Sequence, residues 1–163
     1  MQSWMPLIFI VMAVALAVGP IMMMRPTKSQ QKLSNLRTQA LNSGIRVSVT
    51  VWPERFKLST NRLMRYNLPW QVQKPPFAQV LLIKRNFEHK LHLLGTWDWA
   101  DGEGAGANAF EQLMLDCPIL EDVSAVGCSP AGVFVDWNER KSADLAEIQT
   151  FLESLRKALL DAL

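Results

Sequence analysis

The chain has 163 residues, of which 49% are hydrophobic and 20% are charged, and its formal net charge at pH 7 is +2. This composition is typical of a globular chain and excludes an intrinsically disordered one, and the length suits one ordinary domain. Two cysteines are too few for a disulfide framework. The charge is unevenly spread, because residues 25–90 contain thirteen Lys or Arg and two Glu, whereas residues 91–163 contain four Lys or Arg and thirteen Asp or Glu.

An uncharged, mostly apolar segment runs from Trp4 to Met24. A helix of about 20 residues matches a hydrocarbon core about 30 Å thick, so the segment predicts a transmembrane anchor in residues 1–25. A cleaved signal peptide would need a basic start and a shorter apolar run. Basic residues follow the segment and none precedes it, which predicts an N-terminus outside and a domain in the cytoplasm. The expected membrane and lipid contacts are Trp4, Arg25, Lys28, Lys32 and Arg37.

Residues 26–44 predict a juxtamembrane amphipathic helix, which Gly44 ends. Its narrow apolar stripe consists of Leu33, Leu36, Ala40 and Leu41. Apolar and polar residues then alternate from Ile45 to Val51, which predicts a half-buried strand stopped by Pro53. Residues 54–76 are ambiguous: residues 55–66 are interpreted as one helical turn or a strand, and residues 68–70 and 74–76 as a loop or a sheet edge.

The remaining elements predict an antiparallel sheet and two helices. Residues 78–85 and 90–99 form one expected hairpin, and residues 122–128 and 132–137 form another. A short helix is expected after the glycine-rich loop at 101–106, and the last helix has apolar residues at Leu145, Ile148, Leu152, Leu155 and Leu159. The predicted fold class is α+β, with an N-terminal transmembrane helix followed by a small antiparallel sheet covered by two amphipathic helices, and residues 45–163 forming a cytosolic domain.

Two patterns carry weak chemical signals. Gly102, Gly104 and Ala107 match G-x-G-x-x-A, but the neighbouring Asp101 and Glu103 would repel a pyrophosphate, so a flexible connection is favoured over dinucleotide binding. His89, His92, Cys117 and Cys128 lack the spacing of metal ligands, and structural roles are favoured. We therefore expect no catalytic residue, cofactor or metal site.

Tryptophan and basic residues suggest binding surfaces. Trp97 and Trp99 alternate with Asp98 and share one face of a strand, where a place in the core is favoured over an exposed site. If they are exposed, Trp70, Trp97 and Trp99 would mark a partner surface. The basic half is expected to lie against anionic lipid near the anchor rather than to bind nucleic acid. The alternative is that it faces the acidic half within the fold.

In the first 50 or so residues, the apolar helix runs into Arg25-Pro26, a Lys/Gln-rich run follows at 28–32, and residues 41–47 lead into a strand. This arrangement resembles YajC, the small accessory membrane subunit of the bacterial Sec translocase. The resemblance implies a similar topology and suggests a role in protein translocation. The anchor, together with the absence of paired catalytic groups, predicts a single-pass protein of the bacterial inner membrane that is a non-enzymatic accessory or interaction subunit of a membrane assembly, with a membrane-protein partner and no small-molecule substrate. A ligand- or anionic-lipid-binding module at the cytoplasmic face and a membrane-anchored enzyme are the alternatives.

Overall fold

The computed structural model describes residues 4–23, 26–50, 63–72, 78–85, 92–100, 106–115, 117, 123–139 and 144–162. The chain divides into two compact units, Met1–Asn35 and Leu36–Leu163. The helices are α1 (Met5–Met23), α2 (Lys28–Asn42), α3 (Ala107–Leu115) and α4 (Leu145–Asp161). The strands are β1 (Arg46–Thr50), β2 (Leu63–Leu68), β3 (Val80–Lys84), β4 (His92–Leu94), β5 (Trp97–Trp99), β6 (Val123–Ser129) and β7 (Gly132–Trp137).

The prediction of a transmembrane helix is wrong. No helix in the described part of the chain is both long enough and apolar enough to cross a membrane. The helix within the uncharged run is Met5–Met23, of 19 residues. Two further predictions depended on a membrane-spanning helix and are wrong for the same reason. They are the single-pass topology and the inner-membrane location, with the N-terminus outside and the domain in the cytoplasm.

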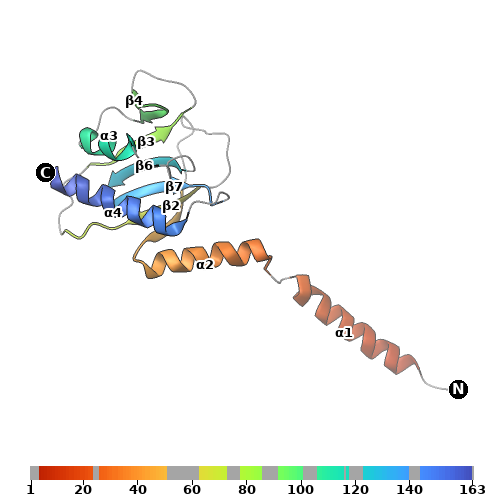
Figure 1. Ribbon diagram of the computed structural model, residues 1–163. Coiled ribbons are helices and arrows are strands. Elements are labelled where there is room, and N and C mark those ends of the chain that lie inside the picture. The colour runs from red at the N-terminus through yellow and green to blue at the C-terminus, as the bar shows by residue number, and fades with distance from the viewer. Residues whose placement is uncertain are drawn as a thin grey trace. The chain divides into compact units, whose positions relative to one another are not determined.

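The strands form one seven-stranded sheet in the order β1-β2-β7-β6-β3-β5-β4, and every pair of neighbours is antiparallel (Figure 1). The centre is the hairpin of β6 and β7, predicted from the alternating residues around its turn. β2 lies within the ambiguous segment 54–76, at the end of the stretch interpreted as a helical turn or a strand, and it joins the sheet between β1 and β7. Its sequence, Leu-Met-Arg-Tyr-Asn-Leu, has too many polar residues for an obvious strand signal.

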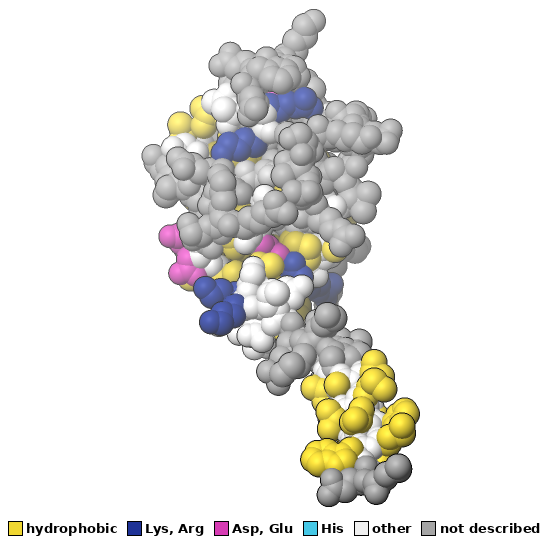
Figure 2. Space-filling view, turned by 90° about the vertical axis from the view of Figure 1, so that its right-hand side faces the viewer, with side chains coloured by type: hydrophobic (Ala, Val, Ile, Leu, Met, Phe, Trp, Pro, Cys, Tyr) yellow, Lys and Arg dark blue, Asp and Glu magenta, His cyan; other side chains and the backbone are white. Residues whose placement is uncertain are grey.

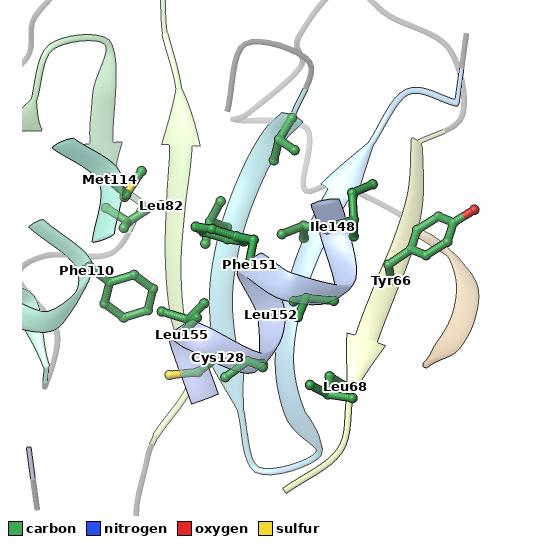
Figure 3. Close-up of a cluster of buried hydrophobic side chains, with 14 of the residues drawn as sticks. Tyr66, Leu68, Leu82, Phe110, Met114, Cys128, Ile148, Phe151, Leu152 and Leu155 are labelled. Carbon is green, nitrogen blue, oxygen red and sulfur yellow. The ribbon is translucent and has the colours of Figure 1, made fainter. Parts of the chain in front are cut away.

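One face of the sheet packs against α4 and α3 and holds the hydrophobic core (Figure 3). On α4 the side chains of Ile148, Leu152, Leu155 and Leu159 are fully buried, as the 3-4-3-4 spacing predicts. They lie over residues such as Tyr66 of β2 and Cys128 of β6. Asp144 caps this helix, because its Oδ1 accepts a hydrogen bond from the Ala146 N–H at 3.3 Å. We call this side of the sheet the helix face and the opposite side the back face.

Candidate functional site

The surface of α1 is the most unusual feature of the first unit. Trp4 and the large hydrophobic residues of α1 up to Val18 are 44% to 73% exposed, and Figure 2 shows hydrophobic side chains over the part of this helix that it colours. Six consecutive residues, 7–12, are all more than half exposed. Because successive helical residues point about 100° apart, these six surround the helix completely. The helix therefore has no polar face to turn toward water.

In the second unit, a polar cluster joins α2 to the end of β7. Arg37 Nε donates a hydrogen bond to Glu139 Oε1 at 2.8 Å, and Arg37 Nη2 forms an ion pair with Glu139 Oε2. The buried Tyr66 hydroxyl donates to the same Oε1 at 2.7 Å. The hydrogen bond to Glu139 raises the pKa of Arg37, and burial raises the pKa of Tyr66 above its ordinary value of 10.0. These contacts fix the second half of α2 on the domain. They also bind the guanidinium of Arg37, which the sequence analysis expected to contact lipid.

The back face carries buried charge in a row that crosses the sheet. Arg65 pairs with Asp136, Asp136 with Ala125, Ala125 with Ile83, and Ile83 with Asp98. Directly paired residues of neighbouring antiparallel strands point to the same face. Asp136 is 0% exposed and Asp98 is 3% exposed. Two carboxylates are thus buried in one row, three strand spacings or about 14 Å apart.

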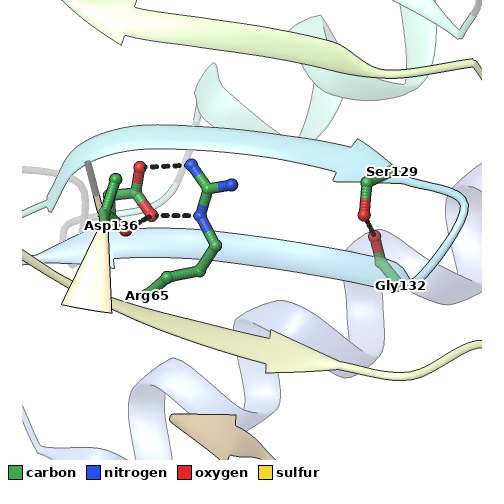
Figure 4. A network of polar contacts seen from close by, with 5 residues as sticks. Arg65, Ser129, Gly132 and Asp136 are labelled. Carbon is green, nitrogen blue, oxygen red and sulfur yellow. Dashed lines mark hydrogen bonds and ion pairs between the residues drawn. The ribbon is translucent and has the colours of Figure 1, made fainter. Parts of the chain in front are cut away.

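Asp136 is held by Arg65 in a two-pronged ion pair (Figure 4). Arg65 Nε lies 2.7 Å from Asp136 Oδ1, and Arg65 Nη2 lies 2.7 Å from Oδ2. Thr50 donates a further hydrogen bond to Oδ1 at 3.1 Å. The guanidinium carbon of Arg65 also lies 3.8 Å from the centre of the Phe134 ring. This geometry satisfies the buried carboxylate and fixes the guanidinium in one orientation.

Phe134 lies against a glycine on the other side. A Cβ atom at Gly127 would come within 2.2 Å of the Val80 carbonyl oxygen and 2.7 Å of the Phe134 ring. Gly127 therefore leaves the space that the ring occupies. The sheet surface at this point is built in layers, with Gly127 beneath Phe134 and Phe134 beneath Arg65.

The predicted tryptophan surface lies inside the domain. Trp97 and Trp99 are each 5% exposed and belong to the hydrophobic core. Trp70 is half-buried and donates its Nε1 hydrogen to the Ser129 carbonyl oxygen at 2.7 Å. The three residues do not form an exposed patch. Trp97 and Trp99 share one face of β5, as their alternation predicts, and this face is the buried helix face.

The other sequence candidates are placed as follows. Trp4 is 64% exposed, and Lys28 and Lys32 are exposed on α2. Arg25, His89 and the glycine-rich residues 101–105 lie outside the described residues. Cys128 is buried, which raises the pKa of its thiol from 9.0 to about 11, and Cys117 is half-buried. Within the described ranges, no three His, Cys, Asp or Glu side chains are grouped to hold a metal ion.

Sequence reasoning missed the polar residues of the back face. Asp136 stands between Val135 and Trp137, and Asp98 stands between two tryptophans. Alternation predicts that such residues face water. The available signal was the rarity of a lone acidic residue between large apolar residues in a strand. Its partner could not be named without the strand order.

Comparisons with known proteins add nothing to these observations. Neither the family models nor the curated proteins nor the solved structures contain a match to this chain, so no similarity to YajC is shown and that resemblance stays a prediction.

Proposed function

We propose that this chain is a non-enzymatic interaction protein that joins a larger protein assembly through α1. The observation that carries the proposal is the exposed, uncharged surface of α1, from Trp4 to Val18. Monomeric proteins rarely leave apolar patches of more than a few hundred Å² in water, and larger patches mark interaction sites. A helix that is apolar on all sides is normally buried on all sides.

This all-round character defines the partner. A single flat surface would cover one side of α1 and leave the opposite side in water. The partner therefore encloses the helix, and it does so with apolar, uncharged side chains, since α1 offers no charge to pair with. A set of apolar helices from other protein chains fits this requirement, because helices pack around a central one through interdigitating apolar side chains.

Charged substitutions on opposite sides of α1 test the enclosure. Ile8→Glu with Met12→Glu places two charges on one side, and Ile10→Glu with Val14→Glu places them about 200° away around the helix. A matched control, Asn35→Glu with Gln39→Glu, adds the same charge to exposed positions of α2. A photo-crosslinking residue at Phe9 in the full chain, expressed in cells, reports what contacts α1.

We expect protein adducts at Phe9 in the unmodified chain and in the α2 control. Both α1 variants should lose them, because a buried unpaired carboxylate costs several kcal/mol. If only one variant loses its adducts, the helix packs on one side and the enclosing partner is wrong. If the adducts contain lipid and no protein, the proposal as a whole is wrong.

A further inference from the structure

Four polar residues form a square on the back face of β1 and β2. Arg46 is paired with Asn67, and Ser48 is paired with Arg65. The two arginines therefore occupy diagonal corners, and a hydroxyl and an amide occupy the other two. Diagonal neighbours on antiparallel strands have Cα atoms about 7–8 Å apart, so two long guanidinium side chains at these corners can reach one small anion.

Arg65 is already oriented for such an anion. Its Nε and Nη2 are bound to Asp136, and its guanidinium carbon lies over the Phe134 ring. Its third nitrogen, Nη1, donates no hydrogen bond within the described part of the chain, and 25% of the side chain is exposed. Figure 4 shows this nitrogen pointing along the strands toward the β6–β7 turn at Ser129 and Gly132. The ion pair thus leaves Nη1 as a donor with a fixed direction and with no partner in the described part of the chain.

Asn67 lies on that side of Arg65. A Cβ atom at Gly132 would come within 2.5 Å of Asn67 Oδ1, so the amide oxygen is turned inward against the β6–β7 turn. This oxygen is buried and has no hydrogen-bond partner among the residues that the structure describes. An amide that holds its oxygen inward directs its nitrogen, which has two hydrogens to donate, to the other side. Asn67 can therefore supply a second donor beside Nη1 of Arg65.

Arg46 and Ser48 complete the square from the edge strand. Both side chains are exposed, and neither has a hydrogen bond or an ion pair with any other described residue. Charged residues on an edge strand also discourage aggregation, and that role requires no ligand. It does not explain Arg65, which lies on the second strand, is partly buried, and directs Nη1, which has no partner among the described residues, along the strand to the side where Asn67 lies.

We infer that this square binds a phosphate-type oxyanion between Arg46 and Arg65, with Ser48 and Asn67 as additional donors. The formal charge of Arg46, Arg65 and Asp136 together is +1, which favours an anion. Guanidinium groups match the oxygen geometry of phosphate, and a tetrahedral oxyanion can accept from several directions at once. The group can belong to a soluble phosphate compound or to a phospholipid headgroup. The inference rests on residues outside α1 and is independent of the proposed assembly function.

Binding of pyrophosphate to the full chain, followed by 31P NMR line broadening, tests the soluble source. Flotation with phosphatidylcholine vesicles, with and without phosphatidic acid, tests the lipid source. Arg46→Gln should weaken pyrophosphate binding about tenfold, the effect of losing one charge-assisted hydrogen bond. Arg65→Lys should weaken it similarly, because lysine can still face Asp136 but lacks the third nitrogen. Lys157→Gln removes the same charge from α4, across the sheet, and should change binding less than twofold.

The outcomes separate the two sources. If pyrophosphate does not bind but phosphatidic acid increases flotation of the unmodified chain and not of Arg46→Gln, the oxyanion is a lipid headgroup. Vesicles that bind through α1 would float the unmodified chain and Arg46→Gln equally, with or without phosphatidic acid. Such binding is therefore distinguished from binding at the square. Absence of binding in both assays overturns the inference, and so does an equal loss in Lys157→Gln and Arg46→Gln.

Discussion

The two faces of the sheet bury their side chains by different means. On the helix face, aliphatic and aromatic residues pack under α3 and α4, and the described residues of this core include no carboxylate. On the back face, Asp136 is equally inaccessible, but it is bound by Arg65 and Thr50. Stability on the first face comes from apolar area and close packing. On the second it depends on keeping a charge pair intact, because a buried ion without its partner is costly.

The two faces also differ in their capacity to bind a ligand. The described side chains of the helix face pack against one another and against the helices, so they are not available to contact a ligand. On the back face, side-chain donors of Arg46, Ser48 and Arg65 have no partner among the described residues and are at least partly exposed. The comparison therefore predicts that substitutions on the helix face change stability alone, whereas substitutions on the back face change stability or anion binding according to the residue chosen.

The largest effect is expected for Arg65→Ala. This substitution leaves Asp136 buried and unpaired, which should lower the free energy of unfolding by about 3–5 kcal/mol in urea denaturation. The control is the double variant Arg65→Leu with Asp136→Leu, which removes both charges and should be much closer to the unmodified chain. A loss below about 1 kcal/mol for Arg65→Ala would show that Asp136 is not buried as described.

Leu152→Ala tests the packing of the helix face. Leu152 is fully buried on α4, so deletion of its side-chain atoms should cost about 2–5 kcal/mol through lost transfer energy and a residual cavity. The matched control is Leu115→Ala on α3, where the side chain is 60% exposed and the change should stay within about 0.5 kcal/mol. Equal losses at the two positions would contradict the assignment of α4 to the core.

Alkaline pH should weaken the helix face through Cys128. Its pKa is 9.0 in its ordinary state and about 11 in the buried site, so stability is fully retained below pH 9. As the pH rises from 9 to 11, the unfolded thiol loses its proton while the folded thiol keeps it, and the free energy of unfolding falls by up to about 1.4 kcal/mol per pH unit. The buried Tyr66, whose pKa is also raised, adds to the fall above pH 10.

Urea denaturation at several pH values measures this slope. Cys128→Ala should flatten the part between pH 9 and 10, whatever its effect on stability at pH 7. An unchanged slope in this variant would mean that the thiol is accessible in the folded protein.

The smallest effect is expected at the start of α4. Asp144→Ala removes the side-chain cap of the Ala146 N–H and should lower the free energy of unfolding by about 1 kcal/mol. Ser154→Ala, at an exposed position within the same helix, serves as the control and should be neutral or slightly stabilising. A neutral Asp144→Ala would show that α4 is held by the core of the helix face alone.

Local patterns predicted the elements whose residues follow one period. The spacing of apolar residues in α4 identified its buried side, and alternation placed β1 and the β6–β7 hairpin correctly. The pattern failed at β2, where Arg65 and Asn67 alternate with Tyr66 and Leu68 but occur in a run too short and too polar to be distinguished from a loop. It failed differently at residues 4–24, where the absence of charge was interpreted as a membrane span.

The sequence by itself determined where apolar side chains gather, because hydrophobic periodicity is a local property of the chain. It identified the buried side of α4, the inward tryptophans of β5 and the uncharged length of α1. Only the tertiary structure decided what the polar residues do. Arg37 and Glu139 are about a hundred residues apart in sequence, and Arg65 and Asp136 are seventy-one apart. A charge finds its partner through strand order and register, and these depend on how the whole sheet assembles rather than on any local pattern.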